Sequence, residues 1–232
     1  MIPAEIGLIE ARTLEPDAGN ADVGKLFGRI GFSRCVLFTP GKTKGAEKMR
    51  NKRLQAMAEG AVLLALALVF NALKLFKLPN GGSVDLAMIP VFLFALRWGV
   101  GWGLLEGFLF GLLQMFIDGA VAWGWQSLLL DYLVAFTPLG LAGLFRGKGR
   151  GIYVGILLGC FLRFIVHFIS GVTIYAITMP TELFGSVYTS PATYSLVYNG
   201  SYMLIDTVIC LIIFGVLYRP LDKYIQTRDL RA

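Results

Sequence analysis

An aspartate, Asp131, lies near the beginning of a strongly apolar stretch that runs from residue 126 to residue 145. The stretch is long enough to span a bilayer, which takes about 20 apolar residues. An ionisable side chain in hydrocarbon costs about 2.5–3.5 kcal/mol on insertion scales, so it usually faces a cavity or a partner. Trp123 and Trp125 come directly before it, and tryptophan collects at membrane–water interfaces. An acid beside aromatic rings at one membrane face is suited to capture an organic cation.

The composition is typical of a multi-pass membrane protein. Of the 232 residues, 56% are hydrophobic and only 16% are charged, proportions that a soluble domain rarely reaches. The net charge of +6 therefore does not indicate a nucleic-acid-binding surface, because basic residues are expected to mark cytoplasmic loops. The three cysteines have no paired spacing, which indicates neither a disulfide framework nor a metal site. No cofactor, metal ion or thiol nucleophile is predicted.

The chain divides into two parts of different composition. Residues 1–48 mix acids, glycine, proline and a basic tract, without an apolar run long enough to span a membrane. We expect this part to be a disordered tail, or an over-early start of the working chain. Its GKT triplet at residues 41–43 lacks the glycine spacing and the preceding strand of a phosphate-binding loop. Residues 49–232 are expected to form the integral membrane domain.

Six apolar segments within this domain are predicted to be membrane helices. Their approximate ranges are 54–76, 86–96, 99–117, 126–145, 152–177 and 196–218. The second is short, and needs tilt or its flanking residues to cross a membrane. Lys and Arg gather in the loops on one side, whereas the opposite loops hold only Lys74 and Lys77. The six segments predict an all-α protein of the plasma membrane with six transmembrane helices. By the positive-inside rule, both of its termini are cytoplasmic, N-in and C-in.

Small and charged residues inside the helices need separate explanations. Glycine recurs at every fourth position of the third segment, at Gly99, Gly103, Gly107 and Gly111. Such spacing lets two helix backbones approach closely, so it indicates packing rather than chemistry. Glu106 in the same segment could pair with Arg163, line a water pocket or contact another subunit, and Asp206 in the sixth segment raises the same question.

The predicted orientation gathers polar and aromatic residues at the outer face. Asp131 and Tyr132 fall in the outer third of the fourth segment, and Asp85 begins the second. The fifth segment carries a stripe at intervals of four: Arg163, His167, Gly171 and Tyr175. Tyr194 and Asn199 lie near the mouth of the sixth. Such a group suits capture of a flat cation, since it offers donors, acceptors and aromatic faces. A single His without a nearby Ser, Cys or metal-ligand cluster makes a poor active site, so no catalytic residue and no enzyme activity are predicted.

Four motifs follow one another along the membrane domain. They are LPNGGSVDLAMIPV (78–91), LLLDYLVAFTPLGLAGLF (128–145), HFISG (167–171) and YSLVYNG (194–200). Together they resemble the thiamine-specific substrate-binding (S) components of energy-coupling factor (ECF) transporters, and the resemblance runs from about residue 49 to the C-terminus. It implies an ECF S-component-like bundle that captures thiamine with high affinity at the extracellular face for ATP-driven uptake.

The resemblance also implies which residues bind thiamine. The ligand positions of the family fall on Asp131, where relatives have Glu, and on Tyr132, His167, Tyr194 and Asn199. Tyr175 stands where relatives have a Trp. Gly81 and Val121 stand where relatives have a Trp and a Tyr, and Trp123 and Trp125 are candidates to replace those rings. The thiazolium is expected to meet Asp131, and the aminopyrimidine His167, Tyr194 and Asn199. A mobile lid is expected at Asn80, Gly81, Gly82 and Ser83, because glycine supplies backbone freedom.

The implied partners are a membrane-coupling T subunit and two ATPase subunits. Ala61 and Ala65 fit the AxxxA pattern with which the family docks the T subunit. Hydrolysis of ATP by separate subunits agrees with the lack of a phosphate-binding loop in this chain. Two alternatives remain at this point: an S component for another vitamin, and an ion-coupled secondary transporter of an organic cation with Glu106, Asp206 and Arg163 as a relay. Such carriers often contain internal repeats, and the sequence has none.

Overall fold

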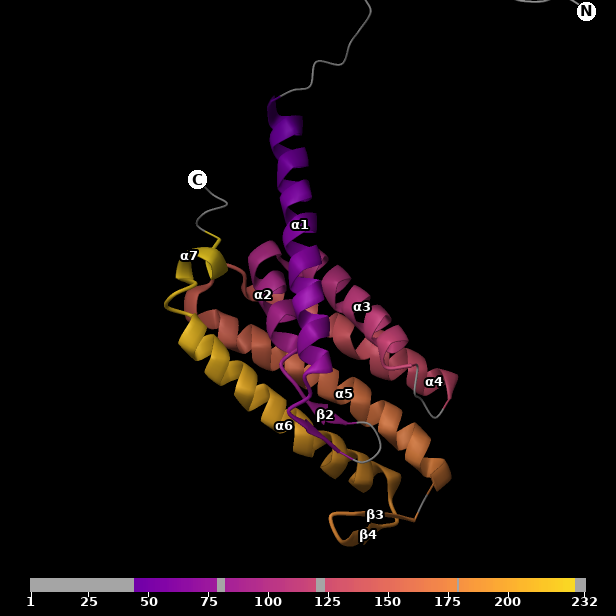
Figure 1. Cartoon of the computed structure of the whole chain (residues 1–232). Helices are drawn as coiled ribbons and strands as arrows, with labels where there is room; N and C mark the ends of the chain where they lie inside the picture. Colours follow the sequence, from indigo (N-terminus) through magenta and orange to yellow (C-terminus); the bar gives the residue numbers. More distant parts are fainter. Residues whose placement is uncertain (1–43, 79–81, 120–123, 179, 228–232) are drawn as a thin grey trace, which may run out of the picture. The chain divides into compact units, whose positions relative to one another are not determined.

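The computed structural model describes residues 44–78, 82–119, 124–178 and 180–227, so the predicted tail lies almost wholly outside it. The described chain is mostly helical, with two short hairpins (Figure 1). Its longer elements are α1 (Lys44–Ala72), α2 (Met88–Trp98), α3 (Val100–Ile117), α5 (Ile152–Thr178) and α6 (Pro191–Leu217). Its shorter elements are α4 (Trp125–Leu128), η3 (Leu129–Val134), η4 (Thr137–Phe145), η5 (Gly149–Gly151), α7 (Asp222–Ile225), and the strands β1 (Phe76–Lys77), β2 (Ser83–Val84), β3 (Thr181–Leu183) and β4 (Ser186–Tyr188).

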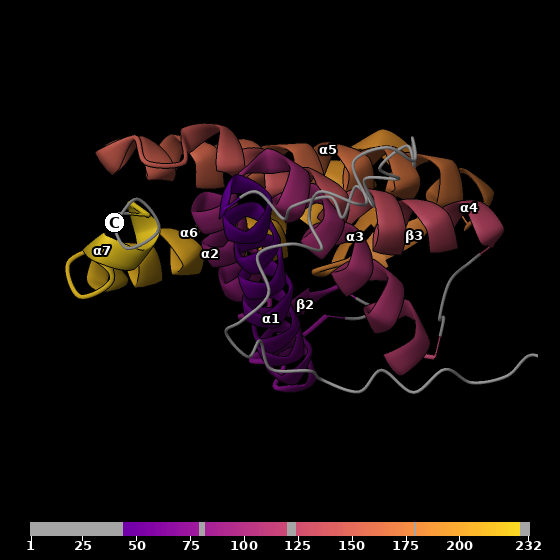
Figure 2. The same ribbon diagram turned by 90° about the horizontal axis from the view of Figure 1, so that it is seen from above.

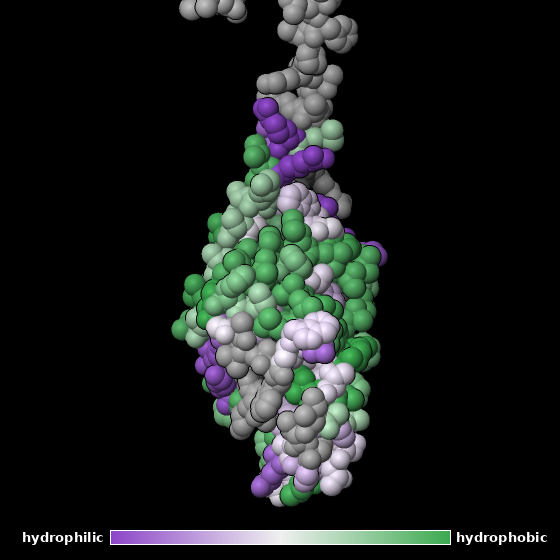
Figure 3. All heavy atoms as spheres, turned by 90° about the vertical axis from the view of Figure 1, so that its right-hand side faces the viewer, coloured by the Kyte–Doolittle hydropathy of each residue, from purple (hydrophilic) through white to green (hydrophobic). Residues whose placement is uncertain are grey.

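Five stretches of the described chain are long and apolar enough to cross a membrane. They are Lys48–Ala72, Val100–Ile117, Trp125–Phe145, Gly149–Ala176 and Pro191–Leu217. Large apolar side chains remain exposed on them, Val216 being 70% and Leu204 67% exposed. A broad hydrophobic band covers the middle of the face seen in Figure 3, and hydrophilic residues gather above and below it. This surface is that of a multi-pass membrane protein, in which lipid solvates the outside of the bundle.

The helix α2 has only 11 residues, as expected for the short second segment. Ten of them are buried, because α2 packs against α1, α3 and η4. Seen from above, it lies inside the bundle behind α1 (Figure 2). A helix enclosed by protein exposes little backbone to hydrocarbon at its ends, so its shortness is tolerated.

Two of the connections between helices form short antiparallel hairpins, so the protein is not strictly all-α as predicted. Strand β1 pairs with β2, and β3 pairs with β4. The second hairpin turns through Phe184 and Gly185, whose φ angles of 51° and 75° are both positive. Two such residues make the tight turn whose twist matches paired strands. Both hairpins lie toward one end of the helical part, and the first turns of α1 and α7 lie toward the other (Figure 1).

The fourth apolar segment is not a regular α-helix. After α4 it continues as a π-helical turn, η3, and then as a 3₁₀ helix, η4, with Pro138 in its first turn. Proline removes a backbone donor and disfavours the α-helical ladder around it. Thr137 Oγ1 donates to the carbonyl of Leu133 at 2.7 Å, which links the end of η3 to the beginning of η4. Single π turns often occur at functional sites, and this one carries Asp131 and Tyr132.

The glycine ladder of α3 packs against this irregular segment. A side chain at Gly107 would collide with the Phe136 carbonyl, and one at Gly111 with the Tyr132 carbonyl. Gly103 lies in the same way against Ala95 and Gly140. The packing role predicted for the ladder is therefore confirmed at Gly103, Gly107 and Gly111, since only glycine lets the two backbones come this close. Gly99 instead ends α2, with a φ angle of 90°.

An ionic cluster at the opposite end from the hairpins joins α1, α2 and α7. Glu59 accepts hydrogen bonds from Arg97 Nε and Nη2, from Trp98 Nε1 at 2.9 Å and from the Tyr224 hydroxyl at 3.1 Å. The Arg97 guanidinium is buried and lies 3.6 Å from the centre of the Tyr224 ring. Paired in this way, the buried charge avoids the cost of an isolated ion.

Candidate functional site

A cavity of about 610 Å³ lies beside the β1–β2 hairpin, a volume typical of small-molecule sites. Its walls come from α3, from the α4–η3–η4 segment, from α5 and α6, and from the hairpin with the end of α1. The lining residues predicted to bind a ligand are Asp131, Tyr132, His167, Tyr175 and Asn199. Gly82 and Ser83 of the predicted lid line it as well. Elements far apart in the sequence thus meet around one cavity.

Asp131 is paired with the single imidazole of the cavity. Asp131 Oδ1 lies 3.0 Å from His167 Nδ1, and Asp131 Oδ2 accepts a hydrogen bond from Ser127 Oγ at 2.7 Å. Because a carboxylate only accepts hydrogen bonds, this contact places a proton on Nδ1. His167 Nε2 is buried and has no hydrogen-bond partner among the described residues. The site therefore holds a negative carboxylate, with an imidazole nitrogen left for a ligand.

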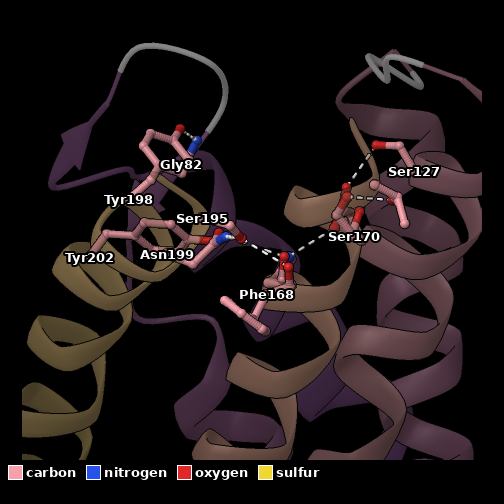
Figure 4. Close-up of polar contacts among 11 residues, drawn as sticks. Gly82, Ser127, Phe168, Ser170, Ser195, Tyr198, Asn199 and Tyr202 are labelled. Carbon is pink, nitrogen blue, oxygen red and sulfur yellow. Dashed lines mark hydrogen bonds and ion pairs between the residues drawn. The ribbon is translucent and has the colours of Figure 1, made fainter. Parts of the chain in front are cut away.

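Asn199 is held by neighbours on both α5 and α6. Its Nδ2 donates to the His167 carbonyl at 3.2 Å and to Ser195 Oγ at 3.0 Å, and its Oδ1 accepts from the Tyr202 hydroxyl at 2.9 Å. Ser195 Oγ in turn donates to the Phe168 carbonyl at 2.9 Å (Figure 4). Gly171 makes this approach possible, because a Cβ there would collide with Ser195 and lie 3.1 Å from Asn199 Nδ2. The amide is thus fixed in position at the cavity wall.

Tyrosines form the aromatic part of the site. Tyr175, Tyr198 and Tyr202 line the cavity. Tyr194 is fully buried behind them, its ring 4.2 Å from that of Tyr175 and stacked at 5.7 Å on that of Tyr198. The structure therefore does not bring Tyr194 to the described cavity surface. Tyr198 and Tyr202 were not predicted, although the spacing of four residues from Tyr194 to Tyr198 to Tyr202 is a signal in the sequence that could have found them.

Polar residues that were not predicted form one side of the cavity. Lys74 Nζ lies 3.4 Å from Asp118 Oδ1, and Gln114 Nε2 donates to Asn71 Oδ1 at 3.1 Å. Lys74, Gln114 and Asp118 line the cavity together with Lys77. The two lysines are the only basic residues of the loops predicted to face outward, which is the signal that could have marked them.

Trp125, one of the two predicted tryptophans, is not brought to the described cavity. Trp125 lies on α4 with 69% of its surface exposed and is not among the lining residues. Trp123 lies outside the described residues, as do Asn80 and Gly81 of the predicted lid.

Buried charges lie next to the cavity, at the beginning of α2 and between α5 and α6. Arg163 lines the cavity and forms its ion pair with Asp206 rather than with Glu106. Glu106 Oε1 has no hydrogen-bond partner within the described ranges. Burial raises the pKa of the Asp85 carboxyl above its ordinary value, and the charge of Arg163 partly opposes this. Among the described residues, no group of three His, Cys, Asp or Glu side chains could hold a metal ion.

Fold and cavity together define a class of protein. Apolar helices enclose a cavity lined by Asp131, which is paired with His167, and by four tyrosines, and this arrangement suits binding of a flat, polar, positively charged molecule rather than its chemical conversion. The class is that of multi-pass membrane proteins that bind a small molecule for transport.

Comparison with known proteins identifies the family. The model of the thiamine transporter protein family (Thia_YuaJ) matches residues 57–226. The thiamine transporter ThiT of Bacillus subtilis is 32% identical over 193 residues, which cover 77% of this chain and 97% of that protein. ThiT of Lacticaseibacillus paracasei is 28% identical over 199 residues, covering 78% and 94% of the two chains. The chain belongs to the thiamine transporter protein family, a family of cell-membrane transporters and not of enzymes.

A solved structure supports the fold. ThiT from Listeria monocytogenes aligns with a TM-score of 0.66 and 24% sequence identity, covering 75% of this chain and 98% of that one. The helical part of this chain therefore has the ThiT fold.

Proposed function

We propose that this protein binds thiamine at the extracellular face and delivers it to an ECF module for ATP-driven uptake. The observation that carries the proposal is the cavity of about 610 Å³ with Asp131 in its wall, in a chain of the thiamine transporter family. Thiamine has a permanently positive thiazolium, which a carboxylate and tyrosine faces attract. Its aminopyrimidine has donors and acceptors that match His167 and Asn199. Tyr132 and Tyr175 would cover the rings, and Tyr194 would support Tyr175 from behind.

The proposed topology has six crossings, with α2 as the short second one and both termini in the cytoplasm. It is supported by the exposed basic residues Arg50, Lys52 and Arg53 in the first turns of α1, and by Arg219 and Lys223 near α7. These two groups lie toward the end opposite the hairpins (Figure 1), and the cavity lies beside the β1–β2 hairpin. Basic residues favour the cytoplasmic side, so the cavity would open outward. The transport domain would comprise residues 49–232.

A direct test is calorimetry of the purified protein with thiamine, together with mass spectrometry of any ligand that co-purifies. Tight binding and co-purified thiamine are expected. Another vitamin in the mass spectrum would keep the S-component role and change its ligand. Uptake by the chain alone, in vesicles that carry only an ion gradient, would instead support a secondary transporter.

We further propose that α1 docks the T subunit through Ala61 and Ala65. Both residues are exposed one helical turn apart, beside the exposed side chains of Val62 and Leu66. Small residues at this spacing let a partner helix approach closely. Ala61→Leu combined with Ala65→Leu should lower co-purification with coexpressed T and ATPase subunits by at least about tenfold, and leave thiamine affinity unchanged.

The matched control for docking is Ala176→Leu, on the exposed surface of α5. This variant should assemble like the wild type. Normal assembly of the double α1 variant would exclude this face of α1 as the docking surface.

The β1–β2 hairpin is proposed to cover the bound ligand. Its Gly82 N–H donates to the Tyr198 hydroxyl at 2.7 Å, which ties the hairpin to α6 (Figure 4). Tyr198→Phe removes this acceptor and should speed thiamine dissociation about two- to tenfold, the effect of losing a bond worth about 0.5–1.5 kcal/mol. Stopped-flow fluorescence measures the rate.

Two further variants test whether the position of the hairpin, rather than a direct contact between the Tyr198 hydroxyl and the ligand, sets the dissociation rate. Gly82→Ala should also speed dissociation, because its Cβ would lie 2.9 Å from the Tyr198 hydroxyl and from the Tyr202 ring. Tyr188→Phe, in β4, loses a hydroxyl that does not line the cavity and should behave as wild type. Unchanged dissociation in both Tyr198→Phe and Gly82→Ala would contradict the covering role.

A further inference from the structure

A buried ion pair lies directly against the proposed thiamine cavity. Arg163 lines the cavity from α5, and its Nη1 lies 3.7 Å from Asp206 Oδ2 on α6. The two residues are 5% and 1% exposed. A pair buried this deeply is screened little by solvent, so the charge of each partner depends strongly on the other for compensation.

The remaining contacts of Arg163 hold its guanidinium in place without neutralising it. The guanidinium lies 4.4 Å from the centre of the Phe136 ring, and Phe136 also lines the cavity. Its Nη1 lies 2.9 Å from Met88 Sδ, and its Nε has no hydrogen-bond partner in the described part of the chain. An aromatic ring and a thioether are weak partners for a full positive charge. Asp206 is therefore the main compensating group in direct contact with Arg163.

Asp206 also reaches the hairpin side of the site. Its Oδ1 accepts a hydrogen bond from the Asp85 backbone N–H at 3.2 Å. Asp85 uses its own Oδ1 to accept the Ala87 N–H at 2.9 Å at the beginning of α2. The Asp85 carboxylate is therefore engaged locally, and Asp206 is the acid that meets both Arg163 and the β2–α2 connection.

We propose that Asp206 is a specificity-determining residue, which neutralises Arg163 so that the cavity accepts a positively charged ligand. This inference rests on the proposed function. Arg163 lies in the cavity wall one helical turn from His167. Without Asp206, its uncompensated positive charge would face the thiazolium. Like charges in a poorly screened site repel strongly, whereas a neutral ligand of the same shape is not repelled by the guanidinium. Asp206 thus acts through Arg163, without touching the ligand.

The test compares two ligands on four proteins. The ligands are thiamine and an uncharged analogue in which a neutral aromatic ring replaces the thiazolium. The proteins are wild type, Asp206→Asn, Arg163→Gln and the double variant. Asparagine keeps the acceptor for the Asp85 N–H and removes the charge, so the hairpin connection is preserved. Affinities come from calorimetry, and thermal unfolding in detergent reports whether each variant folds.

Asp206→Asn should weaken thiamine binding by at least about tenfold and change the affinity for the neutral analogue by less than about threefold. The double variant should recover most of the lost thiamine affinity, because the cation is removed together with its partner. Asp206→Glu, which keeps the charge, should bind thiamine more tightly than Asp206→Asn.

Three outcomes are distinguishable. Equal losses for both ligands in Asp206→Asn, or no recovery in the double variant, would overturn the inference and leave Asp206 a structural residue. If Asp206→Asn does not fold, Arg163→Gln decides, because removal of the cation should favour thiamine over the neutral analogue, and an unchanged ratio overturns the inference. Failure of the wild type to bind thiamine would instead contradict the proposed function.

Discussion

Asp131→Asn is expected to weaken thiamine binding by well over tenfold. Asparagine has nearly the same shape and still accepts the Ser127 hydroxyl, which now lies 2.7 Å from Asp131 Oδ2. It lacks the negative charge that would face the thiazolium and that now pairs with His167 Nδ1 at 3.0 Å. A hydrogen bond to a charged group is worth about 1.5–3 kcal/mol, or about ten- to a hundredfold in affinity. Calorimetry on the detergent-purified protein measures the change directly.

Two companions make this experiment specific. Asp131→Glu keeps the carboxylate and should retain most of the affinity. Glu182→Gln removes the same charge from the exposed surface of β3, near the same end of the helical part, and should bind as wild type. An unchanged affinity for Asp131→Asn would remove this residue from the site.

Gly111→Val is expected to lower both the thermal stability of the protein and its thiamine affinity. A Cβ at this position of α3 would collide with the Tyr132 carbonyl and lie 3.4 Å from Leu133 Cα. These are backbone atoms and cannot rotate away, so α3 and η3 would have to separate. Overpacking of this kind typically costs about 1–3 kcal/mol, occasionally more. Because η3 carries Asp131 and Tyr132, the same separation would displace two cavity residues.

The matched control is Gly101→Val on the same helix, where nothing lies within 4 Å of the added Cβ. It makes the same chemical change, so any loss of helix propensity is shared by both variants. Thermal unfolding and calorimetry should show a clear loss for Gly111→Val relative to Gly101→Val. Equal stability and affinity of the two variants would show that the contact between α3 and η3 does not position the site.

Local properties of the sequence were sufficient to predict the membrane character of the protein and some of the residues that line the cavity. Hydropathy is a sum over neighbouring residues, so it predicted the apolar segments and the short second one without knowledge of their packing. The spacing of four from His167 to Gly171 to Tyr175 is a helical property, and these three residues do line one cavity wall. An acid in an apolar stretch drew attention to Asp131 for its energetic cost alone.

Only the tertiary structure decided which members of such patterns face the cavity and which groups pair. Tyr194, Tyr198 and Tyr202 share one stripe of α6, but the packing of Tyr175 and Tyr198 against Tyr194 buries it, while Tyr198 and Tyr202 line the cavity. Arg163 had two candidate acids, and the contact between α5 and α6 selected Asp206. The π turn at Asp131 lies where Gly111 of α3 closely approaches the Tyr132 carbonyl. Hydropathy and helical periodicity are set by neighbours along the chain. The orientation of the tyrosines and the pairing of Arg163 are set by contacts between distant segments, which neither property describes.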